Sequence, residues 1–211
     1  MNFTRLIVNG CSFTYGQELE DPQNQCWGKL TADKLRIPFT NLAECGAGND
    51  RIYRTTTDHL YQSNDERPLY IIAFSYSARR EEYFEDTKDY RQVSIGYEYT
   101  NEIERFVLEN YNSEIYAHRK LLHWLSTVNA LKANNIPYLV TDYMPESPSD
   151  DDAVKIQHTK MYEAVHTDPN RLENFLRLTD QFPRMPQGHD GFEAQQFLAN
   201  YICEEIIKRW P

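Results

Sequence analysis

Leu6-Ile7-Val8-Asn9-Gly10-Cys11-Ser12-Phe13-Thr14-Tyr15-Gly16 is the stretch that decides the fold of this chain. Its apolar beginning, bounded by turn residues, is typical of a short buried strand. Gly10 allows a sharp bend where the strand ends, because it has no Cβ. Since chemistry collects at the carboxyl ends of strands in open α/β sheets, we expect Ser12 at the lip of a sheet. Its hydroxyl is a candidate nucleophile if a base and an oxyanion site accompany it, and otherwise an ordinary turn residue.

The candidate base lies near the other end of the chain. Residues 186–191, Pro-Gln-Gly-His-Asp-Gly, are typical of a loop, and apolar residues recur at helical spacing over 192–202. Asp190 is the predicted N-cap of this helix, with Glu193 as its capping-box partner. His189 would then be held on a loop just before a terminal helix. The other five histidines have no comparable loop setting.

A glycine-rich loop supplies the third part of a candidate site. Residues 38–43 indicate a second strand, 44–50 form the loop after it, and a helix is predicted from Arg51. Backbone N–H groups in such a turn converge on a developing negative charge, and the helix dipole favours it. Gly46 lies in the middle of this loop. Its amide is therefore a candidate oxyanion donor.

Together these three blocks resemble the SGNH/GDSL hydrolase family. In that family a serine follows the first strand in a Gly-Asp-Ser-like turn, where this chain has Gly10-Cys11-Ser12. A glycine ends an Asn-x-x-x-x-Gly block after the second strand, here Asn41 to Gly46, and a histidine precedes the last helix, here His189. The resemblance spans nearly the whole chain, and its specificity comes from the order of three short motifs. It implies a flavodoxin-like three-layer α/β/α sandwich and ester hydrolysis.

Two positions depart from the family pattern. After the third predicted strand, Leu69–Phe74, the family has an asparagine whose side chain donates to the oxyanion, and Ser77 stands in its place here. A serine hydroxyl can donate one hydrogen bond, over a shorter reach. The family's acid, three residues before the histidine, is replaced by Pro186. Asp180 is the nearest upstream carboxylate and is a candidate to orient His189. Otherwise another carboxylate orients it, or a backbone carbonyl does, in which case the site is a Ser–His dyad.

The bulk properties exclude several classes of protein. The formal net charge is −10 over 211 residues, which argues against a nucleic-acid or anionic-membrane surface. No apolar run approaches a membrane span and no signal peptide is evident, so we expect a cytoplasmic protein. Four cysteines show no metal-ligand spacing, and we expect neither metal nor cofactor. Cys11 and Cys45 flank the candidate site, which makes a cysteine nucleophile a rival to Ser12.

The remaining elements predict a single domain, 1–211, with two insertions. A long helix over 114–135 leads to a fourth strand over 136–142, and 174–178 is a candidate fifth strand. The order of strands and helices predicts a parallel sheet of about five strands, covered on both faces. Insertions near 81–113 and 143–171 follow predicted strands, so both should overhang the carboxyl edge. The second contains the acidic run Asp150-Asp151-Asp152, which indicates a solvated loop.

The first insertion is rich in aromatic and acidic residues, which bears on the substrate. Aromatic faces with interleaved carboxylates suit sugars, and the same tyrosines could instead pack on the core or form an oligomer contact. We therefore expect a small-molecule or glycan ester substrate, with an O-acyl carbohydrate as one candidate. The alternatives are a non-catalytic glycan-binding or structural module of the same fold, and a phosphate binder using the turn after the first strand. The aromatic residues in question are Tyr83, Phe84, Tyr90, Tyr97, Tyr99 and Phe106.

Overall fold

A computed structural model describes residues 2–94, 105, 109, 112–143 and 159–211. Its centre is a parallel sheet in the order β2-β1-β3-β6. These strands are β1 (Arg5–Asn9), β2 (Phe39–Asn41), β3 (Pro68–Phe74) and β6 (Tyr138–Asp142). All residues of β3 and β6 are buried, as expected for parallel strands that have helices on both faces. The predicted α/β fold with a parallel sheet is confirmed.

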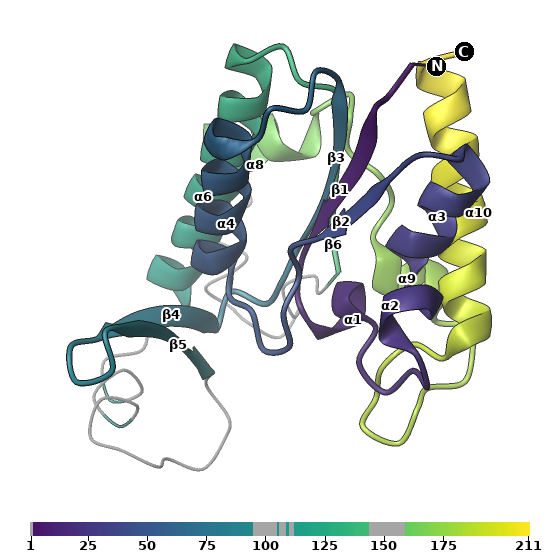
Figure 1. Ribbon diagram of the computed structural model, residues 1–211. Coiled ribbons are helices and arrows are strands. Elements are labelled where there is room, and N and C mark those ends of the chain that lie inside the picture. The colour runs from purple at the N-terminus through teal and green to yellow at the C-terminus, as the bar shows by residue number, and fades with distance from the viewer. Residues whose placement is uncertain (1, 95–104, 106–108, 110–111, 144–158) are drawn as a thin grey trace.

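Two layers of helices cover the sheet (Figure 1). α3 (Trp27–Leu35) and α10 (Phe192–Arg209) pack together on one face. α4 (Asn49–Gln62) and α6 (Ser113–Ala133) pack together on the other, with α8 (Lys160–His166) beside α6. This is the three-layer arrangement that the sequence predicts.

Large aromatic side chains fill the space between the sheet and each helical layer. Trp124 of α6 is buried and stacks on Phe74 at the end of β3, with ring centroids 4.6 Å apart. On the opposite face, buried Trp27 of α3 meets Phe175 edge to face at 5.4 Å. Aromatic pairs in these geometries contribute beyond the area that they bury.

The predicted fifth strand over 174–178 is wrong. This segment forms the short helix α9 (Phe175–Thr179), and Asn174 caps it by accepting a hydrogen bond from the Arg177 amide at 3.0 Å. Such capping by asparagine favours a helix start over a strand. On the side of β6 that does not pair with β3, the described residues form only an isolated parallel bridge between Val140 and Arg171. The sheet therefore has four strands in the described residues.

The carboxyl edge of the sheet, at the bottom of Figure 1, carries shorter elements. α1 (Ser12–Tyr15) and α2 (Pro22–Gln25) follow β1. β4 (Arg79–Phe84) and β5 (Asp89–Ser94) form an antiparallel hairpin after β3. Most of this hairpin belongs to the first predicted insertion. The other insertion residues discussed above, including Tyr97, Tyr99, Phe106 and Asp150–Asp152, lie outside the described residues.

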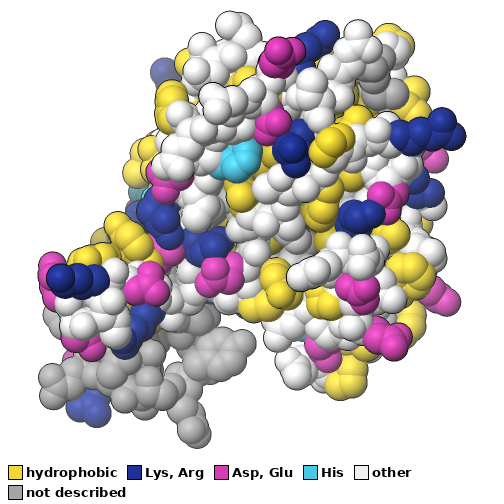
Figure 2. All heavy atoms as spheres, in the orientation of Figure 1, with side chains coloured by type: hydrophobic (Ala, Val, Ile, Leu, Met, Phe, Trp, Pro, Cys, Tyr) yellow, Lys and Arg dark blue, Asp and Glu magenta, His cyan; other side chains and the backbone are white. Residues whose placement is uncertain are grey.

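Charges of both signs are mixed over the face seen in Figure 2, with no large area of a single sign. Dark blue basic and magenta acidic side chains alternate there, including over the hairpin at the lower left. Across the ranges that the structure describes, no helix has the length and apolar character needed to cross a membrane.

Candidate functional site

The turn that carries Ser12 is anchored by the side chain of Asn9, the last residue of β1. Asn9 Oδ1 accepts a hydrogen bond from the Gly10 amide at 2.9 Å, and Nδ2 donates to the Ile52 carbonyl and Thr56 Oγ1 of α4 at 3.0 and 2.9 Å. These bonds lie in the core, where unsatisfied amide groups are costly. Asn9 therefore ties the end of β1 to α4. Ser12, which begins α1, is buried with 2% of its surface exposed.

Gly10 is needed for close packing rather than for an unusual backbone conformation. Its φ is not among the positive values of the chain, so the expectation of a bend that needs glycine's conformational freedom is replaced by a steric reason. A Cβ at this position would lie 2.2 Å from Thr14 Oγ1 and 3.0 Å from the Ala73 carbonyl oxygen. The turn thus packs directly against α1 and against the end of β3.

His189 lies beside this turn and is held by a carboxylate. Its Nδ1 is 2.8 Å from Glu18 Oε2, and its ring lies 4.8 Å from the ring of Phe13, the residue after Ser12. Glu18 Oε1 also accepts the Gln187 amide at 2.9 Å. The two paired side chains are only 12% (His189) and 9% (Glu18) exposed. The structure therefore brings the predicted base to the predicted nucleophile's turn.

Glu18 is a site residue that the sequence analysis missed. Burial opposes ionisation of its carboxyl, but hydrogen bonds from the Gln187 backbone and from the side chain and backbone of His189 hold its pKa below the ordinary value. Its φ of 71° lies in the left-handed region, which is uncommon for residues other than glycine. Since its partner is 171 residues away, no local motif marks it.

Neither aspartate near His189 has its predicted role, which was to orient His189 for Asp180 and to cap the last helix for Asp190. Asp180 is exposed at the C-terminal end of α9, and the carboxylate on His189 Nδ1 comes from Glu18. Asp190 does not cap α10, because Gly191 is the N-cap and no side chain caps it. The Asp190 side chain is instead buried, in contact with the Tyr143 hydroxyl and the Arg184 guanidinium. The capping box with Glu193 is therefore wrong.

The Gly46 loop lies against the Ser12 turn. The Glu44 amide donates to the Gly10 carbonyl at 3.3 Å, which joins the start of the loop to the turn. Gly46 has a φ of +83°, a conformation that favours glycine. On its other side, Gln92 of β5 accepts a hydrogen bond from the Gly48 amide at 3.0 Å. The hairpin thus supports the loop that carries the predicted oxyanion donor.

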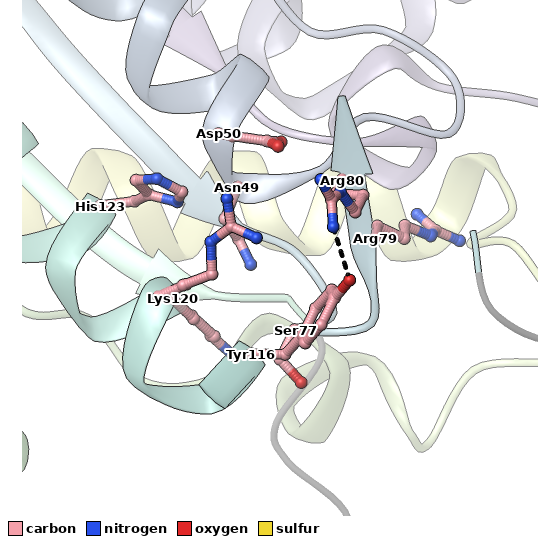
Figure 3. Close-up of a pocket in the computed structure, with 9 residues that line it drawn as sticks. Asn49, Asp50, Ser77, Arg79, Arg80, Tyr116, Lys120 and His123 are labelled. Carbon is pink, nitrogen blue, oxygen red and sulfur yellow. Dashed lines mark hydrogen bonds between the residues drawn. The ribbon is translucent and has the colours of Figure 1, made fainter. Parts of the chain in front are cut away.

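Ser77 lines a small pocket between α4, β4 and α6 (Figure 3). Ser12, Gly46 and His189 are not among the residues that line it. Asn49, which also lines this pocket, donates through Nδ2 to the carbonyls of Ser75 and Tyr76 at 3.1 Å each. Both amide hydrogens of Asn49 are thereby engaged.

The arrangement around Ser12 is suited to acyl transfer, except that Ser12 and His189 are not hydrogen-bonded to each other. Among the described residues, the Ser12 hydroxyl makes no hydrogen bond, to His189 or to any other group, although we expect one between nucleophile and base. The rival nucleophile Cys45 is exposed, but partial desolvation, followed by the nearby Cys11 and Glu44, raises the pKa of its thiol, which disfavours the reactive thiolate. No group of three or more His, Cys, Asp or Glu side chains that could hold a metal ion occurs in the described ranges.

Solved structures with a similar fold include three described as lipolytic proteins or esterases. A putative lipolytic protein of the G-D-S-L family from Desulfitobacterium hafniense is 11% identical, with a TM-score of 0.58 over 95% of this chain and 98% of that one. The psychrotrophic esterase EstA from Pseudoalteromonas sp. is 14% identical, with a TM-score of 0.60 over 98% of each chain. The acetyl xylan esterase Est2A from Butyrivibrio proteoclasticus is 12% identical, with a TM-score of 0.57 over 99% of this chain and 65% of that one. These likenesses confirm the resemblance at the level of the fold.

A family model described as "Family of unknown function (DUF6071)" matches residues 15–161, and the chain belongs to this family. The matched region contains Glu18 and Gly46, begins after Ser12 and ends before His189. A comparison with curated proteins gave no match.

Proposed function

We propose that this protein hydrolyses carboxylic esters, with Ser12 as nucleophile, His189 as general base and Glu18 as the residue that orients His189. The observation that carries the proposal is the 2.8 Å contact between His189 Nδ1 and Glu18, beside the turn that begins with Ser12. A nucleophile, a base and a third group that orients the base form the general arrangement for activating a weak nucleophile. The similarity in fold to esterases agrees with this reaction class.

In the proposed mechanism, Ser12 Oγ attacks the ester carbonyl carbon and His189 Nε2 accepts the hydroxyl proton. Glu18 holds the proton on Nδ1, which keeps Nε2 free to accept, and stabilises the imidazolium that forms. His189 then gives its proton to the leaving alcohol, and water releases the acyl group by the reverse sequence. The Ser12–His189 hydrogen bond has to form when substrate binds, as is common for catalytic contacts that are long in a substrate-free site.

The backbone amides of Ser12 and Gly46 are the proposed oxyanion donors. The Gly46 loop is hydrogen-bonded to the Ser12 turn through Glu44 and Gly10, which supports this pairing. Ser77 remains the proposed third donor. Because losing one such donor typically lowers turnover by roughly ten- to a thousandfold, unchanged turnover in Ser77→Ala would remove it from the site.

An O-acylated carbohydrate is the proposed substrate class. Tyr83 and Tyr90 lie on the hairpin at the carboxyl edge, 46% and 45% exposed, with ring centroids 5.2 Å apart. Exposed aromatic faces at a sheet edge can stack on the CH groups of a sugar ring. One structural neighbour is described as an acetyl xylan esterase, which agrees with this class.

The test compares hydrolysis of short aryl esters and of acetylated xylo-oligosaccharides by matched variants. Ser12→Ala and His189→Ala should each lower kcat/KM by roughly 10²–10⁴-fold, and Glu18→Gln should lower it as well, because an amide can donate to Nδ1 and hold the wrong tautomer of His189. Exposed residues of the same type serve as controls: Ser126→Ala, His166→Ala and Glu204→Gln. These controls should hydrolyse esters as the wild type does.

A non-catalytic binding module is the second candidate function. It is favoured by the 2% exposure of Ser12 and by the lack of a hydrogen bond from its hydroxyl within the described part of the chain. If wild type, Ser12→Ala and His189→Ala give the same slow rate, hydrolysis is background and this second function replaces the first.

A further inference from the structure

A pocket beside the edge strand β2, called here the edge pocket, has room for a small ligand. It lies where β2 meets α1 and α2, which are neighbours below the sheet in Figure 1. Its volume is about 280 Å³, whereas the pocket beside Ser77 has about 10 Å³, roughly the space of one water. Since a cavity of about 150 Å³ can hold benzene, the edge pocket can hold one six-membered ring with its substituents. The residues that line it are Tyr15, Pro22, Gln23, Phe39 and Asn41.

One wall of the edge pocket lies next to Ser12. Tyr15 ends α1, the single-turn helix that Ser12 begins, and residues three apart lie on the same side of a helix with Cβ atoms about 5–6 Å apart. Asn41 ends β2 and is paired with Val8 of β1, the strand that leads into the Ser12 turn. The edge pocket therefore borders the end of the sheet that carries the candidate site.

The elements that form the edge pocket are packed together at the buried residue Cys26. A Cβ added to Gly16, the residue after α1, would lie 3.1 Å from the Cβ of Cys26, and Asn41 Nδ2 lies 3.9 Å from Cys26 Sγ. The ring of Phe39 is held against α3, because a Cβ added to Gly28 would lie 2.9 Å from Phe39 Cε2. The walls are thus fixed by packing before a ligand binds, which lowers the cost of binding.

The polar side chains of the edge pocket have hydrogen-bonding capacity to spare. Asn41 Oδ1 accepts the Ala43 amide at 3.0 Å, and the only contact of Asn41 Nδ2 with a described residue is the long one to Cys26. The Tyr15 hydroxyl and the Gln23 amide make no hydrogen bond within the part of the chain that the structure describes. A ligand with several hydroxyl groups can bond to all three side chains.

The edge pocket has no charged residue among those that line it. A bound ion would find no ion-pair partner there, and an unpaired charge is costly to remove from water. Tyr15 and Phe39 supply aromatic surface, and the negative face of an aromatic ring attracts the weakly positive CH groups of a sugar. Aromatic rings combined with uncharged polar groups suit a ligand that has both CH and hydroxyl groups.

We propose that the edge pocket binds one uncharged pyranose ring, the alcohol part of the acylated carbohydrate. This assignment rests on the proposed function, because it makes the pocket the site for one part of that substrate. Tyr83 and Tyr90 of the hairpin do not line the pocket, so their contact with a sugar is a separate matter. An acyl chain is the alternative occupant, and it would leave the amide groups of Asn41 and Gln23 without a ligand partner.

NMR titration of the wild type with methyl β-xyloside and with methyl β-glucoside tests binding without hydrolysis, since neither probe contains an ester. At least one of them should shift the side-chain amide signals of Asn41 and Gln23 along a saturable curve. Tyr15→Ala should weaken binding by about two- to tenfold, the effect of losing one aromatic contact, and Tyr15→Phe should restore most of it. Because Tyr15 is 39% exposed, Tyr15→Ala should stay folded, which a thermal melt by circular dichroism checks. Gln23→Ala, a second change at an exposed residue, should also weaken binding.

Tyr61→Ala and Gln196→Ala are the matched controls. Tyr61 is an exposed tyrosine of α4, which covers the other face of the sheet, and Gln196 is an exposed glutamine of α10. Both variants should bind as the wild type does. Absence of saturable binding by the wild type, or equal binding by Tyr15→Ala and Tyr61→Ala, would overturn the proposal. Tighter binding of methyl glucuronide or of hexanoate than of both neutral glycosides would overturn it as well.

An ester assay separates this proposal from the proposed function. The ratio of kcat/KM for acetylated methyl β-xyloside to kcat/KM for ethyl acetate should fall in Tyr15→Ala, through a higher KM for the sugar ester, and stay unchanged in Tyr61→Ala. Hydrolysis of both esters with the same ratio in both variants would overturn the edge pocket as a sugar site and leave the esterase in place. Saturable sugar binding without hydrolysis would support the pocket as a sugar site and remove the esterase.

Discussion

Glu18 joins two ends of the chain, because its carboxylate accepts from the Gln187 amide and from the backbone and side chain of His189. An imidazole held at Nδ1 by a carboxylate has a defined tautomer and orientation. The left-handed φ of Glu18 is a local cost that the surrounding contacts maintain. A costly backbone conformation at the residue that positions a candidate base agrees with a functional role for Glu18.

The lowered pKa of Glu18 leads to a prediction about stability in acid. A carboxylate whose pKa is lower in the folded state stabilises it above the unfolded value of 4.5, and this contribution disappears as the pH falls through the folded pKa. Glu18→Gln removes the contribution. The free energy of unfolding of the variant should therefore be lower than that of the wild type at pH 7, and the difference should shrink below about pH 4.5. Urea denaturation across this range measures it.

Glu204→Gln is the control for this stability experiment. Glu204 is exposed on α10 and forms no ion pair with a described residue. Its substitution should leave the free energy of unfolding nearly unchanged at each pH. A difference between wild type and Glu18→Gln that stays constant down to the acid transition would show that Glu18 acts by shape and not by charge.

At the scale of elements, the turn after β1 depends on the absence of a side chain at Gly10. Gly10→Ala would force a Cβ against Thr14 Oγ1 at 2.2 Å and against the Ala73 carbonyl. Overpacking of this kind typically costs about 1–3 kcal/mol, and here it would also displace α1 and Ser12. We expect Gly10→Ala to lower both the free energy of unfolding and esterase turnover, measured by urea denaturation and by the aryl ester assay.

Gly191→Ala provides the comparison, because the nearest atom to its added Cβ is Met185 Sδ at 3.5 Å, an ordinary contact. This variant should retain turnover and most of its stability. If Gly10→Ala behaved like Gly191→Ala, α1 would be shown to shift without consequence for the site.

The sequence predicts elements well where one strong pattern dominates. The apolar runs of β1, β3 and β6 and the long stripe of α6 are found where they are expected, because burial on both faces or on one helical face leaves a clear period. Residues 174–178 were predicted as a strand because a run this short fits a strand or a helix. The side chain of Asn174 caps the segment and so favours a helix. The predicted capping role of Asp190 is wrong because its side chain contacts Tyr143 and Arg184, and the local sequence pattern around Asp190 does not show these contacts.

The residues of the candidate site likewise fall into those that a local sequence pattern predicts and those that it does not. Gly46 and His189 lie on loops and Ser12 begins α1, each next to a predictable element, so their order in the sequence suffices to propose that they meet. Glu18 and the edge pocket depend on contacts between separate segments of the chain. No local pattern of a single sequence records such contacts.

At the scale of the whole molecule, the first and last segments of the chain are packed together. Phe3 and Trp210 meet edge to face at 5.5 Å, and the two termini lie side by side in Figure 1. The Trp27 amide of α3 donates to the buried side chain of Gln195 in α10 at 2.7 Å. One cluster of buried residues runs from β1 to α10 through the sheet. The helix that follows His189 is therefore part of the main core.

This continuity predicts that residues 1–211 unfold as one cooperative domain. Differential scanning calorimetry should show a single transition, with a calorimetric enthalpy equal to the van't Hoff enthalpy. For 211 residues the expected enthalpy is about 150 kcal/mol near 60 °C. A chain ending at Asp190 lacks α10 and should give no such transition, because Trp27, Leu6 and their neighbours lose the helix that covers one face of the sheet. Two resolved transitions in the full chain, or a cooperative transition in the shortened one, would show that the segments before and after the candidate-site loops fold separately.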